Sequence, residues 1–153
     1  LDPAFTDCGE ISQDGLEVAF SVSSDVVRNW QGQPLRAFNT ENSVTFKLTF
    51  LEADAQTVQE IYYGTTVTSQ LGDQSNALIG QPDSTAQSFV ISCIDSSDDS
   101  ITTYVIPRGI VTDRGAVVEQ SGDASKFEVT ITALYDTTLA AAVNKLFDND
   151  LTS

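Results

Sequence analysis

The sequence predicts one all-β domain with a single helix, and three observations support this fold class. Apolar and polar residues alternate with a period of two in several stretches, which is typical of strands that bury one face. Only one stretch shows clear helical spacing. The 153 residues fit one ordinary domain, whose core can form without a disulfide framework or a metal.

Three stretches, 16–23, 43–51 and 127–133, show the strand alternation most clearly. Mostly polar residues occupy every second position, so each stretch is expected to expose one face and bury the other. The apolar residues expected on the buried face are Leu16, Val18, Phe20 and Val22 in the first stretch, Val44, Phe46, Leu48 and Phe50 in the second, and Phe127, Val129, Ile131 and Ala133 in the third.

Two neighbouring strands are expected at 89–94 and 101–106, joined by the polar turn 95–100. Their apolar residues fall on both faces, which indicates burial on both sides. Pro107 comes directly after the second strand. Because proline has no amide hydrogen to donate to a ladder, it is expected to end this strand or to leave it at an edge.

The segment 54–63 is expected to form the helix, with Asp54 as its N-cap and Gly64 as its C-terminal stop. A helix that follows a long strand directly can cover one open face of a sheet. A second, less regular apolar stripe lies at 139–147, and an extended C-terminal arm is an equally good interpretation of it.

Two long connections, 24–42 and 65–86, are predicted to be loops, because neither shows sustained periodicity. The first contains a short strand-like piece at 35–40 and the only tryptophan, Trp30. Connections of this length in a small domain are usually functional or disordered. Trp30 is expected either to lie in the core or to anchor a neighbouring subunit, since buried Trp and Arg dominate interface energetics.

The charge balance is strongly acidic, with 22 Asp and Glu against 7 Lys and Arg and a net charge of −15. Proteins that grip double-stranded DNA use clustered basic residues, whereas the basic residues here are scattered singly. The net charge either only keeps the protein soluble or repels a polyanion that passes close by. No apolar run reaches the roughly 18–20 residues of a membrane helix, so no membrane partner is expected.

The residues that most often carry catalysis are missing from the sequence. It contains no His, no phosphate-binding glycine motif and no Gly-x-Ser-x-Gly motif. Carboxylates are plentiful, but most lie beside Ser, Asn or Gly, where Asp is usually solvated in a turn. We therefore expect no enzymatic activity, no catalytic residues, no metal site and no cofactor.

Two features leave alternatives open. The acidic run 95–99 is either a solvated hairpin turn or a calcium site, and the turn is favoured because the spacing of a calcium loop is missing. Cys8 and Cys93 form either one disulfide or two free thiols. Free thiols, in a protein made in a cytoplasm, are the preferred interpretation.

Several motifs follow one another between Gly9 and Tyr135. Trp30 and Leu35-Arg36 precede a strand that passes through Leu51-Glu52-x-Asp54 into a helix ending Tyr62-Tyr63-Gly64. The later motifs are Tyr104-Val-Ile-Pro-Arg-Gly109, Val111-Thr-Asp-Arg-Gly115 and Val129-Thr-Ile-Thr-Ala-Leu-Tyr135. In order and spacing they resemble the major tail tube proteins of long-tailed (siphovirus-type) bacteriophages of actinobacteria.

This resemblance implies a β-sandwich or partly open barrel flanked by one helix. Such subunits form hexameric rings that stack helically, and their strands line an acidic lumen that conducts the genome without binding it specifically. The implied partners are other copies of the chain and the tape measure, tail terminator and baseplate proteins. The implied location is the virion tail, after assembly in the host cytoplasm.

Two other functions remain as alternatives. A related injection tube, from a secretion system or a bacteriocin, would share the fold and the ring. An acidic surface or capsid-decoration β-sandwich would instead be compact in solution and would carry a Cys8–Cys93 disulfide if exported.

The resemblance also implies how one domain spanning 1–153 is organised. It has an N-terminal arm at 1–10, long loops at 24–42 and 65–86, and a C-terminal tail at 136–153. The residues expected to contact neighbouring subunits are Val26, Val27, Arg28, Trp30, Leu35 and Arg36 in the first loop, and Leu139, Val143, Leu146 and Phe147 in the tail.

Overall fold

The computed structural model of the chain describes residues 3–51, 56–69, 75–80, 82–83, 85–94, 100–117 and 125–147. The described part of the chain is mostly β-structure with one helix, as predicted from the sequence. In order, its elements are β1 (Glu17–Arg28), β2 (Pro34–Phe50), α1 (Gln56–Tyr63), β3 (Val67–Ser69), β4 (Ser75–Ala77), β5 (Gln87–Ile94), β6 (Ile101–Arg114), β7 (Phe127–Ala133) and β8 (Asn144–Phe147).

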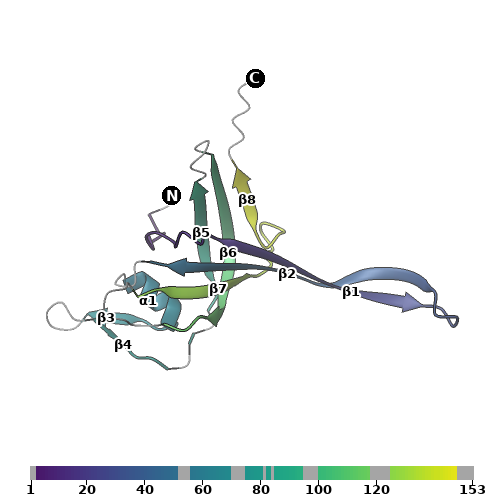
Figure 1. Ribbon diagram of the computed structural model, residues 1–153, viewed down its shortest axis with the longest axis horizontal. Helices are drawn as coiled ribbons and strands as arrows, with labels where there is room; N and C mark the ends of the chain where they lie inside the picture. Colours follow the sequence, from purple (N-terminus) through teal and green to yellow (C-terminus); the bar gives the residue numbers. More distant parts are fainter. Residues whose placement is uncertain are drawn as a thin grey trace, which may run out of the picture.

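Six strands form one open sheet in the order β1-β2-β7-β6-β5, with β8 also paired to β6. All of these pairings are antiparallel. The long strand β6 joins the two halves of the sheet, because its second half pairs with β7 and its first half with β8. In Figure 1, β1, β2 and β7 run across the body while β5, β6 and β8 stand upright. The two short strands β3 and β4 pair only with each other.

Pro107 lies inside β6, so the prediction that it ends a strand or marks an edge was wrong. Gln87 pairs with Gly109 and Phe89 pairs with Ile106, which leaves β6 one residue longer than β5 at this point. A proline is tolerated at such a bulge, because the local ladder is already interrupted. The Ser88 hydroxyl donates a hydrogen bond of 2.7 Å to the Pro107 carbonyl oxygen, which satisfies this polar group.

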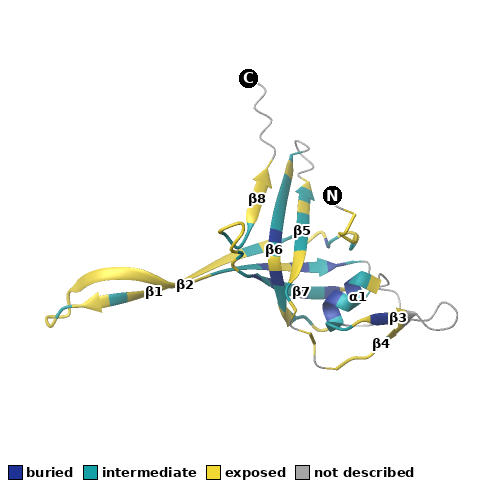
Figure 2. Ribbon diagram, turned by 180° about the vertical axis from the view of Figure 1, so that it is seen from behind, coloured by how far each residue is buried: buried dark blue, intermediate teal, exposed yellow. Residues whose placement is uncertain are grey.

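The hydrophobic core lies between the two halves of the sheet and α1. The period-two pattern is confirmed in β7, where Phe127, Val129, Ile131 and Ala133 are all buried. In β2 the inward residues Phe46, Leu48 and Phe50 are buried as well, as Figure 2 shows along the dark part of the strands. Helix α1 adds Val58, Ile61 and Tyr62 to this core.

Helix α1 ends where the sequence predicted. Gly64 has a φ of 62°, and its amide donates a 2.8 Å hydrogen bond to the Glu60 carbonyl oxygen. A Cβ here would come within 2.8 Å of the Pro82 Cβ and 2.9 Å of the Asp83 amide nitrogen, so glycine is required both for φ and for space. The predicted N-cap, Asp54, lies outside the described residues.

The segment 24–42 is not a loop. Strands β1 and β2 continue through it as a paired hairpin, and only the residues between Arg28 and Pro34 form the turn. The alternation is hidden in the sequence because the register shifts between Ser23 and Ser24, where Thr40 is the extra residue on β2. We call residues 20–44 the arm.

The second predicted loop, 65–86, and the apolar stripe at 139–147 both contain strands. Within 65–86, β3 and β4 form a short hairpin. The apolar stripe at 139–147 does not form a second helix, because its last four residues are β8, an extended strand paired with β6 from Thr102 to Val105. Of the two alternatives, a helix and an extended segment, the structure shows the extended one, and its last residues pair with β6 as a strand.

Phe46→Ala is expected to lower the free energy of unfolding by about 3–5 kcal/mol, because it leaves a cavity at a fully buried position. The matched control is Phe20→Ala, on the same face of the same hairpin but 75% exposed, which is expected to change it by less than about 0.5 kcal/mol. Urea unfolding of the unassembled subunit measures both. Equal losses would contradict the placement of Phe20 outside the core.

Candidate functional site

The arm projects from the body as a two-stranded ribbon, which Figure 1 shows reaching far beyond the rest of the sheet. From Phe20 to the turn it covers about ten residues, which corresponds to roughly 30 Å of extended strand. Between Pro34 and Asn42 every residue of β2 is exposed. The arm is therefore held mainly by backbone pairing, to which the Thr40 hydroxyl adds a 3.1 Å hydrogen bond to the Ser23 carbonyl oxygen.

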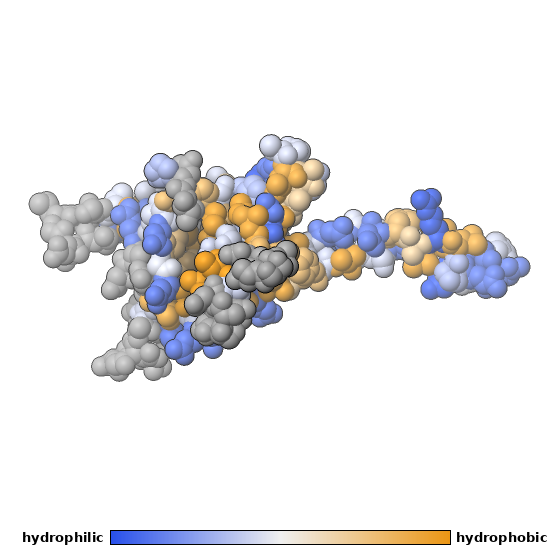
Figure 3. Space-filling model, turned by 90° about the horizontal axis from the view of Figure 1, so that it is seen from above, coloured by the Kyte–Doolittle hydropathy of each residue, from blue (hydrophilic) through white to orange (hydrophobic). Residues whose placement is uncertain are grey.

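The exposed surface of the arm is unusually apolar. Trp30 at the turn is 102% exposed, and Leu35 beside it is 68% exposed. Phe20 and Val22 continue the face that carries the core, whereas Val27 and Phe38 lie on the opposite face. Figure 3 shows hydrophobic surface along the arm, interrupted by polar side chains. Apolar side chains gathered on a protrusion mark an interaction surface.

The tip of the arm has a defined structure. The Asn29 amide donates a 2.9 Å hydrogen bond to the Gln33 carbonyl oxygen, and the Asn29 side chain accepts one of 2.8 Å from the Gln33 amide. The Arg28 guanidinium donates to the Gly32 carbonyl oxygen at 3.0 Å. These bonds close the turn from both sides, so Trp30 is presented outwards by an ordered loop.

The outer part of the arm differs in charge from the rest of the chain. Over its full length, residues 20–44, the arm also carries Glu41 and has a net charge of zero. Residues 24–40 carry Arg28 and Arg36 against the single carboxylate of Asp25, a net charge of +1. The whole chain carries −15, so the rest of it carries −16. Residues 24–40 are thus a part of the described surface that an acidic neighbour would attract.

The contact candidates in the C-terminal tail lie together at β8 and the turn before it, away from the arm. Leu146 and Phe147 are 52% and 58% exposed, and Leu139 is 38% exposed. Val143 is half-buried against the core of its own subunit. The Lys145 ammonium lies 5.4 Å from the centre of the ring of Tyr104, its partner on β6, so the two side chains share one face of the sheet.

The face of the sheet opposite the core is polar and rich in hydroxyl groups. The Thr112 and Thr132 hydroxyl oxygens lie 2.8 Å apart, and the Lys47 ammonium lies 3.2 Å from the Glu128 carboxylate. The register places the following residues on this face: Glu17, Ser21, Ser23, Glu41, Ser43, Thr45, Lys47, Thr49, Glu128, Thr130 and Thr132. We call this surface the hydroxyl face.

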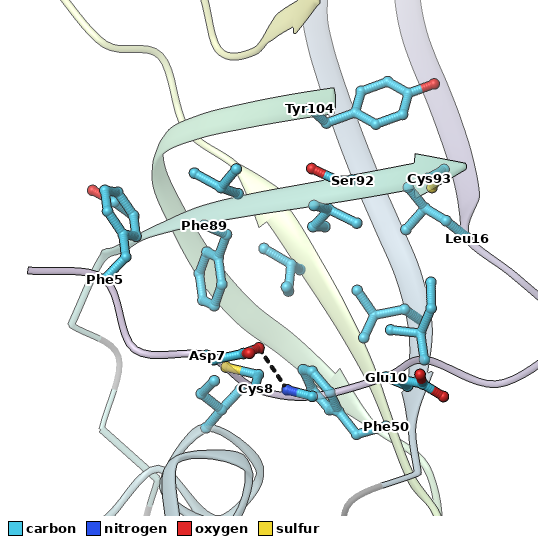
Figure 4. Close-up of a pocket in the computed structure, with 18 of the residues that line it drawn as sticks. Phe5, Asp7, Cys8, Glu10, Leu16, Phe50, Phe89, Ser92, Cys93 and Tyr104 are labelled. Carbon is cyan, nitrogen blue, oxygen red and sulfur yellow. Dashed lines mark hydrogen bonds between the residues drawn. The ribbon is translucent and has the colours of Figure 1, made fainter. Parts of the chain in front are cut away.

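A cavity of about 1850 Å³ opens on the other side of the sheet, between β1, β2 and β5. Figure 4 shows the N-terminal segment with Asp7, Cys8 and Glu10 on one side of it, and Phe89 and Cys93 of β5 on another. The Asp7 carboxylate accepts a 2.9 Å hydrogen bond from the Gly9 amide, which shapes this segment.

Both cysteines line this cavity as free thiols, as the sequence analysis preferred. Burial raises the pKa of the Cys8 thiol, and the neighbouring Asp7 carboxylate raises it further. Burial also raises the pKa of the Cys93 thiol. Neither thiol is therefore set up as a nucleophile, which requires a lowered pKa.

Sequence reasoning identified the tip of the arm but missed most of its length. Phe20 and Val22 were assigned to the core because they follow the core alternation, and only the geometry shows that they lie beyond its edge.

The acidic run 95–99 lies outside the described residues. Among the residues that are described, no cluster of His, Cys, Asp and Glu could hold a metal ion. Helix α1, with eight residues, is far too short to cross a membrane, and the described segments contain no other helix.

The described sheet is open, and its arm exposes apolar side chains that the single subunit leaves uncovered. The chain belongs to the phage tail tube protein family: the family model described as "Phage tail tube protein" matches residues 2–152. Members of this family are structural subunits of the virion tail that assemble with their own kind into a tube. A search of curated proteins found no match.

Trp30→Ala is expected to leave the stability of the subunit within about 0.5 kcal/mol, because the side chain touches almost nothing in its own chain. It is expected to raise the protein concentration needed for assembly about thirtyfold, the equivalent of a hot-spot loss of about 2 kcal/mol. Sedimentation of polymer against total concentration measures this.

The matched control is Leu78→Ala, which removes a side chain that is 75% exposed but lies off the arm. The control is expected to assemble like the unmodified chain. Normal assembly by Trp30→Ala would exclude Trp30 as an anchor.

Alkylation of Cys8 and Cys93 by iodoacetamide is expected to be slower in the folded subunit than in the urea-unfolded chain. A raised pKa means a smaller thiolate fraction at any given pH, so the rates should converge only as the pH rises above the folded pKa values. Mass spectrometry of the labelled peptides at pH 7, 8 and 9 gives the rates. Equal rates at the lowest pH would contradict the burial of the thiols.

Proposed function

We propose that the chain is the major tail tube subunit of a long-tailed, siphovirus-type phage of actinobacteria, and that it forms helically stacked hexameric rings. One observation carries the proposal: the arm exposes apolar side chains on both faces and at its tip, and these remain in water unless another subunit covers them. Burying a tryptophan removes about 200 Å² of surface from water. At about 25 cal/mol/Å², that is an upper estimate of ~5 kcal/mol for each subunit.

In this proposal the hydroxyl face lines the lumen. The face is mostly polar: β6 adds Ile110, which is paired with Thr132, and β2 adds Lys47. The carboxylates of Glu17 and Glu41 are exposed on it. A lumen of this kind repels the phosphates of DNA, and the scattered hydroxyl groups keep a layer of water, so the genome slides without being gripped. A ring of six chains would carry −90, six times the charge of one.

The open edges of the sheet support the same arrangement. Strands β1 and β5 lie at the two ends of the strand order, and no described strand covers their outer edges. Exposed edges of this length normally need a partner strand or a protecting device. Pairing between neighbouring subunits would close the ring.

The remaining partners follow from this position in the virion. The tube would meet a tape measure protein inside, a tail terminator at one end and a baseplate at the other, after assembly in the host cytoplasm. Negative-stain microscopy of the purified protein at high concentration tests the proposal, with hollow tubes of sixfold rings as the expected result. A monodisperse, compact monomer under all conditions would overturn it and favour the decoration-protein alternative.

Replacing Glu17 and Glu41 by Lys is expected to slow genome release without preventing assembly, because a basic lumen attracts the phosphates that must slide past it. DNA release from purified virions at two salt concentrations measures the effect, which should weaken at high salt. The matched control is Glu17→Gln with Glu41→Gln, which removes charge without reversing it. Release at the unmodified rate by the Lys variant would place these residues outside the lumen.

A further inference from the structure

The cavity between β1, β2 and β5 is an open groove beside the hydrophobic core, lined by apolar and polar side chains. Its walls are built from side chains that pack on the core without being covered, among them Leu16, Val18, Phe89, Ile91 and Tyr104. Each of these is only half-buried. The groove is open to solvent, so these apolar side chains can be covered by an apolar group of another subunit.

The arm carries apolar groups that lack a cover. Trp30 and Leu35 lie at the end of the two-stranded arm, and Val27 lies on β1 next to the turn. The arm cannot fill the cavity of its own chain, because β1 begins at the cavity wall with Leu16 and Val18 beside it and then runs away from the body (Figure 1). The tip thus ends roughly 30 Å from the cavity of its own subunit.

The charges of the two surfaces are complementary. The N-terminal segment places the carboxylates of Asp7 and Glu10 on the lining of the cavity, where Figure 4 shows both. The tip carries Arg28 and Arg36, and it is a basic part of an acidic chain. Within the described structure, the guanidinium group of Arg36 makes neither a hydrogen bond nor an ion pair. It is therefore available to a carboxylate of another subunit.

We propose that the cavity is the receptor for the arm of a second copy of the chain, with Trp30 inserted between the N-terminal segment and β5. Arg36 then lies at the rim, near Asp7 and Glu10. This inference rests on the proposed tube and adds to it the place where the arm docks. Each subunit both donates an arm and receives one, so the contact is head-to-tail and continues from copy to copy.

The native thiols in the cavity provide a direct test. Gln31→Cys places a thiol beside Trp30 without altering the anchor itself, and a short bismaleimide can then link it to Cys8 or Cys93 of the receiving subunit. Polymer assembled from a mixture of ¹⁵N-labelled and unlabelled chains is treated with the reagent, and linked peptides are identified by mass spectrometry. Mixed-isotope peptides prove that the link joins two chains.

The expected result is a ladder of linked subunits in assembled polymer, with the tip peptide joined to the Cys8 or Cys93 peptide. The yield should exceed that of the control Ile79→Cys, an exposed position off the arm, by about tenfold or more, because docking raises the local thiol concentration. Introducing Gln31→Cys together with Cys8→Ser and Cys93→Ser should abolish the ladder.

Two results would overturn the inference while leaving the tube intact. One is polymer of normal yield in which the tip thiol forms no link to either cavity thiol. The other is a tip–cavity link found only within single chains. A failure of the proposed function is seen separately, because the unmodified chain would then form no polymer at all.

Discussion

The hydrogen-bonded ladder between β1 and β2 beyond the edge of the core is the interaction on which the assembly surfaces depend. Inside the body this ladder is supported by buried side chains such as Phe46, but outside it mainly backbone pairing and the closed turn remain. An isolated two-stranded hairpin is marginally stable in water. The arm avoids this limit because one end of its ladder is fixed by the rest of the sheet.

The core residues could be predicted well from the sequence, because apolar and polar residues alternate along the strands that form the core. Phe46, Leu48, Val129 and Ile131 could be placed from period-two spacing alone, and α1 from helical spacing and Gly64. The outer arm could not be read in this way. Where no core covers a strand, neither face has to be apolar, and the extra residue at Thr40 shifts the alternation as well.

The remaining errors concern contacts between residues far apart in the chain. The stripe ending at Phe147 has helical spacing, but its last residues pair with β6, and only the folded sheet reveals this partner. Pro107 looked like a terminator because nothing local indicates the bulge opposite Gln87. The tip of the arm was found because Trp30 is conspicuous in composition. The cavity was missed because its two sides, near Cys8 and Cys93, meet only after folding.

The open groove beside the core has a consequence for the stability of the subunit before assembly. A domain whose packing is completed by a neighbour gains stability by mass action, so its melting temperature rises with protein concentration. If an arm docks in the groove as proposed, the free subunit is less stable than the same chain in the polymer, and proteolysis removes unassembled chains more readily.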